Sequence, residues 1–430
     1  MKKKVLWLNE DKLAIVISIS IFIIYMNMLF SYIYNDGFSF SSFSKWIFII
    51  AIFYIIKNKF FKIDKFLLLF CLSGFLLITL KYLFLGYGDI PSGYKTIIKQ
   101  YIWFVPLCLL PIVYYFSKFK EIYFFNTIII PTSFLFLYNI YHLFRLNFNR
   151  GELSSFFNPI ISYDIGFISI CLLLFCYAFY LKGKRAYFVM FLSLITMFSL
   201  ILHGSRGTWI AIPIVIGFVT CIYFKSQLKK SLTAVSLFLI LLCLSLFLPN
   251  SPIINRIDHF KADAQSIEID QMHNSTGTRL LLWQNSIELF KKAPILGVGT
   301  YEIEKENCRL YELKKLALCY HHQHNIFFHE LAANGILGIL SLLLTFGISS
   351  FYFLRHLSKS DIGNKFLALT GLVFVFYYFI CGMTEYYLFF LNTTYLFYFV
   401  VSSLMSFIYI NNKLGGNNNK FSHIKNLSKI

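Results

Sequence analysis

The chain has 430 residues, of which 58% are hydrophobic and 14% are charged, and its formal net charge is +19. Soluble domains carry roughly 45–50% apolar and about 25% charged residues, so this composition excludes an ordinary water-soluble domain. The basic residues stand in short clusters between apolar runs. That pattern favours loops at a membrane surface over a nucleic-acid-binding face.

Apolar stretches of about 20 residues, the length that spans a bilayer core, recur along the whole chain. The basic run Met1–Lys4 precedes the first stretch, and no signal-peptide cleavage site follows it. The sequence therefore predicts an all-α polytopic membrane protein. About twelve transmembrane helices are expected near residues 13–34, 43–57, 65–85, 97–116, 123–144, 161–181, 186–203, 207–224, 231–249, 328–354, 365–381 and 385–410.

The basic residues also predict an orientation in the membrane. The two ends of the chain and every second connecting segment carry 23 Lys and Arg residues, whereas the opposite short loops carry 6. Positive charge accumulates on the cytoplasmic side of membrane proteins. We therefore expect both termini in the cytoplasm, an even number of helices, and the long segment 250–330 outside.

The long segment differs in kind from the other loops. It holds ten acidic and nine basic residues, and its middle, Ser275–Lys292, has the pattern of an amphipathic helix. Pro294 ends that helix and Gly297–Gly299 forms a turn. A long loop with its own helices is usually functional, although a passive cap over the bundle is the alternative. We divide the chain into membrane helices (1–249 and 328–410), a helical outer loop (250–327) and a disordered Asn- and Lys-rich cytoplasmic tail (411–430).

Two cysteines, Cys308 and Cys319, lie in this outer loop, and the other seven lie in predicted membrane helices. An oxidising compartment favours a disulfide between them, and two free thiols are the alternative.

The first motif with chemical potential is His203–Trp209, at the outer end of a helix hairpin. Ser205 can cap the helix that begins near Gly207. A helix N-terminus beside Arg206 is suited to a phosphate group. The alternative is an arginine that reaches lipid headgroups.

The second motif is Thr276–Trp283, in which Arg279 and Trp283 share a helix face at a spacing of four residues. This pair can hold a diphosphate, or it can be a cation–π anchor at the membrane surface.

The third motif is His321–Glu330, which contains four of the ten histidines. Zinc binding is one interpretation, but neither an HExxH spacing nor a cysteine cluster accompanies the motif. General acid–base catalysis fits better because histidine titrates near neutral pH. A polar helix entry is the alternative without function. The small residues of Ala332–Gly338 then permit close helix packing.

Four further features carry weaker indications. The outer loops Gly86–Pro91 and Arg150–Pro159 could line a substrate mouth, although most such loops are connectors. Asp164 and Glu385 lie near predicted helix ends. Carboxylates inside a membrane are candidates for function, but an interfacial position costs less, so we expect them there.

Taken together, the motifs resemble those of the O-antigen ligase family of bacterial inner-membrane proteins. Their order and spacing agree over about residues 150–410, and the third stretch is the most specific; the N-terminal helices match only in hydrophobicity. The matching stretches are Ser205–Trp209; Arg279 with Trp283 and Pro294–Gly299; and His322–Asn325 with Glu330 and Asn334–Gly338.

The resemblance implies a GT-C-like helix bundle with a periplasmic loop subdomain. It also implies transfer of a glycan from undecaprenyl diphosphate to the lipid A–core oligosaccharide at the periplasmic face of the inner membrane. His324 is then the general base, and Arg206 and Arg279 neutralise the diphosphate. His322, Asn325 and Trp283 are expected to bind substrate. No metal or other cofactor is implied, and the partners are the lipid-linked donor, the acceptor and membrane lipids, with no nucleic acid.

Related members polymerise the glycan or attach it to protein hydroxyls, and the sequence does not separate these activities. A transporter of lipid-linked sugar is the alternative outside the enzyme class. We consider it weaker because transporters usually show repeats or broken helices near the midplane of the membrane.

Overall fold

The computed structural model is entirely helical in the part of the chain that it describes. It describes residues 10–34, 40–58, 63–83, 106–157, 159–223, 225–248, 251, 253–255, 257–258, 261, 275–359 and 361–427. Within these ranges some side chains, such as those of residues 27–34, 40–46, 415–427 and Arg206, lie outside the description.

Among the described residues, seven helices are long and apolar enough to cross a membrane, and four shorter apolar helices accompany them. All eleven coincide with predicted spans, which confirms an all-α polytopic membrane protein. The predicted span 97–116 is described only from residue 106 onward. In chain order the elements are α1 (Glu10–Tyr34), α2 (Phe40–Asn58), α3 (Lys65–Leu83), α5 (Leu110–Phe116), α6 (Glu121–Arg145), α7 (Arg150–Phe156), α8 (Ile160–Tyr180), α9 (Gly183–Ile201), α10 (Arg206–Tyr223), α11 (Leu228–Ser245), α13 (Ser275–Lys292), α14 (Thr300–Glu312), α15 (Ile326–Lys359), α16 (Ile362–Gly382), the 3₁₀ turn η1 (Tyr387–Phe389) and α17 (Leu391–Leu427).

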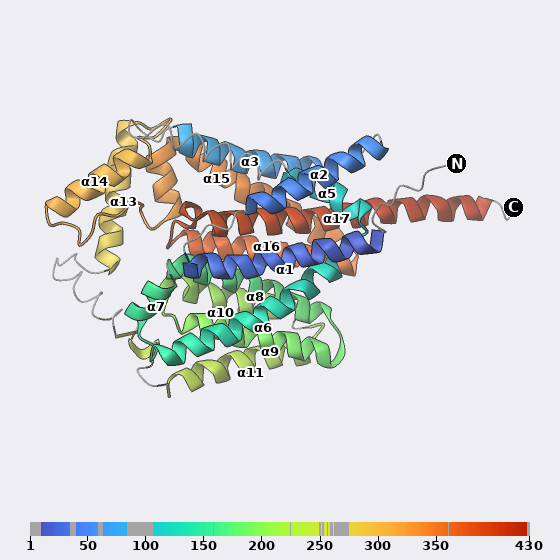
Figure 1. Cartoon of the computed structure of the whole chain (residues 1–430), viewed down its shortest axis with the longest axis horizontal. Helices are drawn as coiled ribbons and strands as arrows, with labels where there is room; N and C mark the ends of the chain where they lie inside the picture. Colours follow the sequence, from blue (N-terminus) through green and yellow to red (C-terminus); the bar gives the residue numbers. More distant parts are fainter. Residues whose placement is uncertain are drawn as a thin grey trace.

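The bundle has buried central helices and exposed outer ones (Figure 1). In α8 and α17, 94% of the apolar stretch is buried inside the protein, whereas in α11 only 22% is. The apolar side chains that α11 leaves exposed suit contact with lipid, because a lipid-facing helix gains nothing from burying them against protein.

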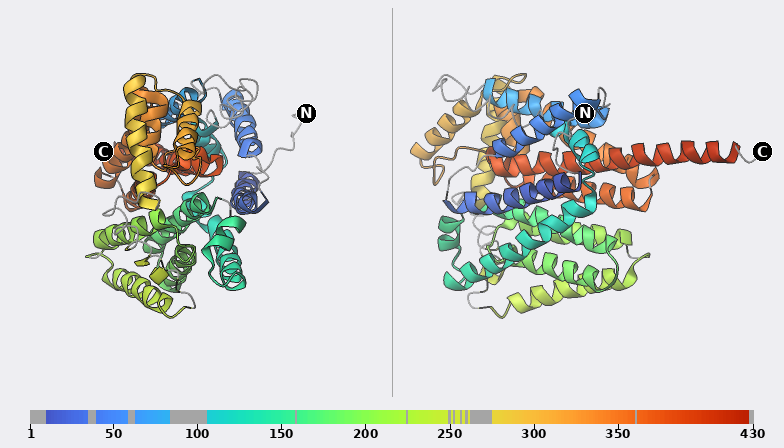
Figure 2. Two further views of the ribbon diagram at one scale, coloured as in Figure 1. Left: turned by 90° about the vertical axis from the view of Figure 1, so that its left-hand side faces the viewer. Right: turned by 45° about the vertical axis from the view of Figure 1, so that its right-hand side comes forward.

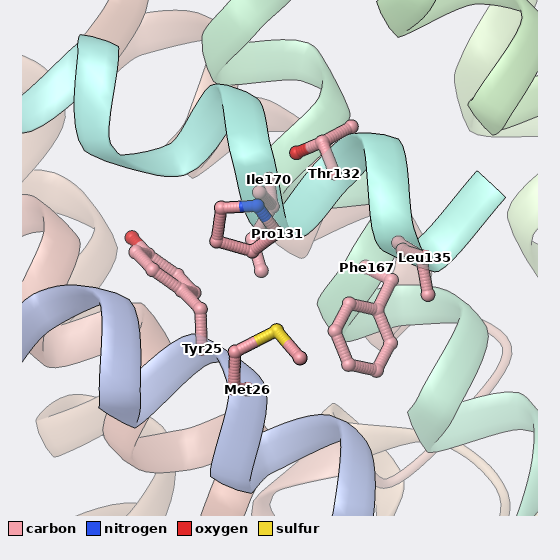
Figure 3. A pocket seen from close by; sticks show the side chains of 7 residues that line it. All are labelled: Tyr25, Met26, Pro131, Thr132, Leu135, Phe167 and Ile170. Atoms are coloured by element: carbon pink, nitrogen blue, oxygen red, sulfur yellow. The ribbon is translucent and has the colours of Figure 1, made fainter. Parts of the chain in front are cut away.

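A small cavity lies between α1, α6 and α8. Its volume is about 10 Å³, and it lies where Tyr25 and Met26 of α1 face Pro131 of α6 and Phe167 of α8 (Figure 3). That volume is at the lower limit for one water molecule. This interface is therefore a packed contact rather than a ligand site.

The outer-loop helices α13 and α14 lie together at one end of the bundle (Figures 1 and 2). The C-terminal part of α17 extends beyond the opposite end. The predicted amphipathic helix Ser275–Lys292 is present with those bounds. Two helices were not predicted: α14, which begins after Gly299 (φ +84°), and α7, where Asn149 caps the helix by accepting from the backbone N–H of Gly151.

Two glycine-containing motifs, Pro294–Gly299 and Ala332–Gly338, are joined by backbone hydrogen bonds. Helix α15 is broken at Gly335, whose φ of 61° and ψ of −149° are not helical. The break frees backbone groups that pair with the turn after α13. Three such bonds are Val298 N to Ala332 O (2.9 Å), Gly299 N to Ala333 O (3.0 Å) and Ile336 N to Pro294 O (2.9 Å).

The contact between these motifs requires glycine on both sides. A Cβ atom on Gly297 would lie 2.3 Å from the carbonyl of Ala333, and one on Gly335 would lie 2.6 Å from the carbonyl of Ile295. The sequence predicts a turn and a close helix contact at these motifs. The structure adds that the two motifs contact each other and fix the outer loop to α15.

Helix α17 extends to Leu427. The division of the chain into four segments, with a disordered tail over residues 411–430, stays a prediction.

Candidate active site

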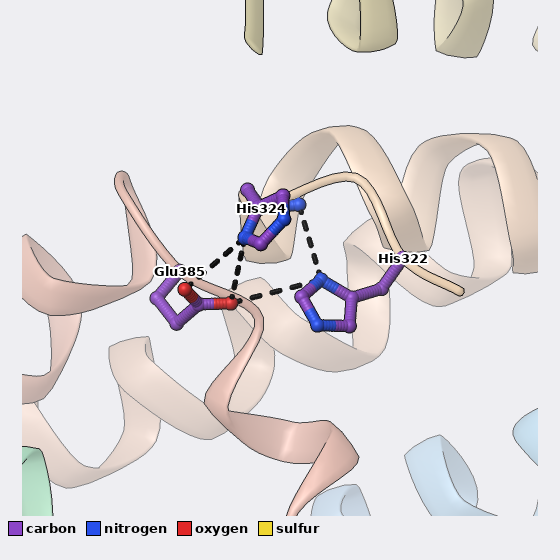
Figure 4. Close-up of side chains that lie close together, drawn as sticks. All are labelled: His322, His324 and Glu385. Atoms are coloured by element: carbon purple, nitrogen blue, oxygen red, sulfur yellow. Dashed lines mark hydrogen bonds and ion pairs between the residues drawn. The ribbon is translucent and has the colours of Figure 1, made fainter. Parts of the chain in front are cut away.

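The site is built around Glu385, in the turn between α16 and α17. Its carboxylate oxygens both lie 3.2 Å from Nδ1 of His324 (Figure 4). Nδ1 of His322 lies 3.6 Å from the same carboxylate. The Glu385 side chain is 3% exposed and that of His324 is 21% exposed. The arrangement is therefore a buried carboxylate that holds a partly exposed imidazole.

The charge of this carboxylate is stabilised by its neighbours. Burial alone would raise the pKa of Glu385, but the charge of His324 and its hydrogen bond, then the charge of His322 and the backbone N–H of Tyr386, lower that pKa to about 2. Glu385 is consequently ionised over the whole physiological pH range. Because it faces Nδ1 of His324, the Nε2 atom of that ring remains for a substrate.

The backbone conformation at His324 brings the imidazole rings of His322 and His324 close together. His324 has a φ of +47°, in the left-handed region that non-glycine residues rarely adopt. Its backbone N–H donates to Nδ1 of His322 at 3.3 Å, and the two rings lie 4.4 Å apart between centroids. Strained backbone of this kind is common at functional sites because it fixes side-chain direction.

The segment before the histidines is attached to the outer-loop helices. Trp283 donates from Nε1 to the carbonyl of Gln323 at 3.1 Å, and its ring stacks on Phe328 at 5.1 Å. Asn307 donates to the carbonyl of Tyr320 at 2.8 Å. The sequence predicts that Trp283 binds substrate. These contacts support a role in placing the segment that carries His322 and His324.

A disulfide closes this segment on α14. Cys308 and Cys319 are bonded, with 4.4 Å between their Cα atoms. The sequence left a disulfide and two free thiols open, and the structure has the disulfide. It joins the residue after Asn307 to the residue before Tyr320, so it restrains the same connection as the Asn307 hydrogen bond.

The side chain of Asn325 makes hydrogen bonds to other residues of the protein. Its side-chain oxygen accepts from the backbone N–H groups of Phe327 and Phe328, at 2.8 and 3.1 Å, so it caps α15. Its amide donates to the carbonyl of Met383 at 2.8 Å. The residue is only 5% exposed. These bonds support a role in joining α15 to the Glu385 turn, and the role of Asn325 in substrate binding stays a prediction.

The two predicted arginines lie on elements that contact the Glu385 turn (α10) or the segment that carries His324 (α13). Arg279 is on α13, four residues and about 6 Å along the helix axis from Trp283. Arg206 is the first residue of α10, and its side chain is outside the described part. A Cβ atom on its neighbour Gly207 would lie 2.2 Å from Oγ1 of Thr384, so the start of α10 touches the residue before Glu385.

A second buried carboxylate supports the Glu385 turn. Glu330 on α15 accepts from the hydroxyl of Tyr386 at 2.9 Å and from the amide of Asn334 at 2.6 Å. The Tyr386 ring stacks on His329 with 3.8 Å between centroids. Tyr386 also donates its backbone N–H to Glu385 at 3.0 Å. These contacts fix the residue next to Glu385 in both side chain and backbone.

Asp164 and Glu385 lie near helix ends, as expected, and both side chains are buried within the protein. Asp164 is 0% exposed and pairs with His203 at 2.7 Å and with the hydroxyl of Ser205. Glu385 was missed as a site residue because its histidine partners lie about 60 positions earlier in the chain. The available indication was the rule that a carboxylate close to membrane helices is a candidate for function.

The same side chains also have a spacing that suits a divalent cation. One ligand atom each from His322, His324 and Glu385 lie within 4.8 Å of one another. Imidazole and carboxylate groups are common zinc ligands. The geometry alone therefore allows either a metal site or a base that is oriented by its carboxylate.

Known proteins share the central part of this chain. A family model described as O-antigen ligase matches residues 188–343, which include α10, α13 and the His322–His324 segment. An uncharacterized protein of Haemophilus influenzae is 27% identical over 179 residues, and an O-antigen ligase of Escherichia coli K12 is 25% identical over 178 residues. Each alignment covers 40% of this chain; it covers 45% of the first relative and 42% of the second. The chain thus spans less than half the length of these curated relatives.

Proposed function

The chain belongs to the O-antigen ligase family through its residues 188–343, and from this premise we propose that it is a glycan ligase of the bacterial inner membrane. It transfers O-antigen glycan from undecaprenyl diphosphate to the lipid A–core oligosaccharide. The observation that carries the proposal is the pairing of the partly exposed His324 with the buried, ionised Glu385. A sugar hydroxyl is a weak nucleophile near neutral pH, and such a pair supplies the general base that it needs.

In the proposed reaction the acceptor hydroxyl loses its proton to Nε2 of His324 while its oxygen bonds to the anomeric carbon of the donor sugar. The bond from that carbon to the diphosphate oxygen breaks, and undecaprenyl diphosphate leaves with the electron pair. Direct displacement inverts the anomeric centre without a covalent intermediate. Glu385 stabilises the imidazolium that forms, in the way that a triad carboxylate supports its histidine.

The leaving group requires positive charge at the opposite side of the reacting carbon. We propose Arg206, at the positive end of α10, and Arg279 on α13 as the groups that neutralise the diphosphate. The contact of Gly207 with Thr384 and the bond of Trp283 to Gln323 support this assignment, because each brings an arginine-bearing element to the turn or segment that holds His324 and Glu385.

The proposed reaction occurs at the periplasmic face, with both termini in the cytoplasm. The distribution of basic residues supports this orientation. The position of α13 and α14 at the end of the bundle opposite the C-terminal part of α17 is also consistent with it (Figure 1). We further propose that catalysis is independent of metal, so that His322 and His324 act as a proton acceptor and its neighbour rather than as ligands.

Two activities of the same family are the alternatives, because donor and acceptor choice depends on the shape of the substrate cavity. One is polymerisation of the glycan, and the other is transfer to a protein hydroxyl. Transport of lipid-linked sugar is less well supported, because a histidine–carboxylate pair beside a helix N-terminus has no required role in moving a lipid.

Replacement of the chromosomal gene by one encoding His324→Ala, followed by inspection of surface glycolipid, tests the proposal. A ligase defect leaves bare lipid A–core and accumulates carrier-linked polymer. Core that carries a single repeat unit would instead indicate a polymerase, and unchanged glycolipid with lost protein glycosylation would indicate the third activity. Normal glycolipid and normal protein glycosylation would contradict the assignment of His324.

A further inference from the structure

Asp164 is a buried carboxylate in the second turn of α8 whose role is not explained by the proposed chemistry. It is 0% exposed. Removing a carboxylate from water is costly unless its oxygens accept hydrogen bonds. One oxygen faces Nδ1 of His203 at 2.7 Å, and the other accepts from the hydroxyl of Ser205. Both partners belong to the short connection between α9 and α10, so this carboxylate holds one loop.

The connection that Asp164 holds is tight and well defined. Gly204 has a φ of +78°, which permits the sharp change of direction between the two helices. The carbonyl of His203 accepts from Arg150 at 2.5 Å, and the His203 ring stacks on Phe157 with 4.9 Å between centroids. The loop is thereby fixed from α7 as well as from α8.

The loop continues into the first turn of α10, which contacts the candidate active site. Arg206 follows Ser205 and begins α10, and Gly207 lies against Thr384 so closely that a Cβ atom would be 2.2 Å from its hydroxyl. Thr384 precedes Glu385, which holds His324. The first turn of α10 is thus enclosed between the Asp164 contacts on one side and the Glu385 turn on the other.

We propose that Asp164 is a positioning residue for the transfer reaction. By holding His203 and Ser205, it sets the place of the first turn of α10, and with it Arg206, relative to the His324–Glu385 pair. The inference rests on the proposed function, since it assigns a purpose to the position of Arg206. Displacement of a charge-stabilising group by about 1 Å can reduce a rate by about 10²-fold, so a buried anchor for this helix end has catalytic consequences.

The test uses the full-length protein in proteoliposomes and a double-mutant cycle with Arg206→Ala. Asp164→Ala is expected to lower kcat/KM for a polyprenyl-diphosphate-linked glycan donor by about 10- to 100-fold. In the Arg206→Ala background the same change should cost less than about 3-fold, because the group that it displaces is already absent. Asp164→Asn can still bond to both His203 and Ser205 and should largely restore activity.

Amide hydrogen exchange provides a readout that does not depend on activity. Exchange in residues 203–208 should rise in Asp164→Ala. It should not rise in the control Ser169→Ala, which removes another buried polar group of α8 that does not contact the loop. Should Asp164→Ala fail to fold, Ser205→Ala breaks one of the two bonds and enters the same cycle.

Unchanged exchange in residues 203–208, or an equal loss of kcat/KM with and without Arg206, would overturn the inference. Absence of transfer by the wild-type protein would contradict the proposed function instead. In that case the exchange measurement still decides whether Asp164 holds the start of α10.

Discussion

Replacement of Glu385 by glutamine separates the charge of this carboxylate from its shape. Glutamine can still accept a hydrogen bond from Nδ1 of His324, but it carries no negative charge. In the wild-type protein the buried carboxylate favours the protonated form of the facing imidazole. That form arises when His324 takes the proton of the acceptor hydroxyl, so the variant should lose stabilisation of the transition state.

The expected size of the effect follows from the pKa of Glu385. Burial would raise that pKa, yet the facing histidines and the Tyr386 N–H lower it from the ordinary value of 4.5 to about 2. This net difference, in which the neighbours more than offset the cost of burial, corresponds to about 3 kcal/mol. If most of it acts on His324, Glu385→Gln should reduce kcat by about 10²-fold. The contribution is fully present above pH 4.5 and is lost only as the pH falls towards 2.

The assay is transfer of labelled glycan from a polyprenyl diphosphate donor in proteoliposomes between about pH 5 and 9. The lower kcat should hold across this whole range, because Glu385, with a pKa of about 2, is ionised throughout it. The control is Glu304→Gln, which alters the more exposed pair of Glu304 with His321 and should leave kcat unchanged. A wild-type kcat for Glu385→Gln across this range would refute this account of the pair.

Three further predictions concern the supports of the site. The Cys308→Ser/Cys319→Ser double variant should lose about 3 kcal/mol of stability in the chain-entropy model, measured as thermal unfolding with and without reductant; equal curves for wild type and variant would contradict this. Gly335→Ala should destabilise by about 1–3 kcal/mol because of its positive φ and its contact with the outer loop, whereas the control Gly347→Ala, whose Cβ meets nothing within 4 Å, should be neutral or stabilising. Asn325→Ala removes the cap of α15 and should cost about 1–2 kcal/mol in thermal unfolding with a reduced transfer rate; a wild-type transfer rate would argue against its role in joining α15 to the Glu385 turn.

The membrane helices were predictable because the bilayer imposes a length and a polarity on each of them. The amphipathic helix Ser275–Lys292 was equally clear, since its pattern ends at Pro294. The motifs that contain Arg206, Arg279 and His324 were identified from residue types whose chemistry is uncommon at a membrane surface. Each of these predictions depends on local sequence alone.

The parts that could not be predicted depend on contacts between distant segments. The pairing of Glu385 with His324 joins positions 61 residues apart, and neither helix ends nor spacing reveal it. The bonding of the two glycine motifs likewise requires the break in α15 at Gly335, which hydrophobicity does not indicate. The burial of Asp164 likewise depends on its partners His203 and Ser205, which lie 39 and 41 positions later in the chain.

The central claim is that His324 is the base of a glycan transfer reaction, and its most direct test is a rate. The purified protein in proteoliposomes is given an undecaprenyl-diphosphate-linked glycan and lipid A–core, and product is quantified for wild type, His324→Ala and the control His321→Ala. His321 is 62% exposed and pairs with Glu304 instead of Glu385. The account predicts a loss of at least about 10²-fold for His324→Ala and little change for His321→Ala. Transfer by His324→Ala at the wild-type rate would contradict it.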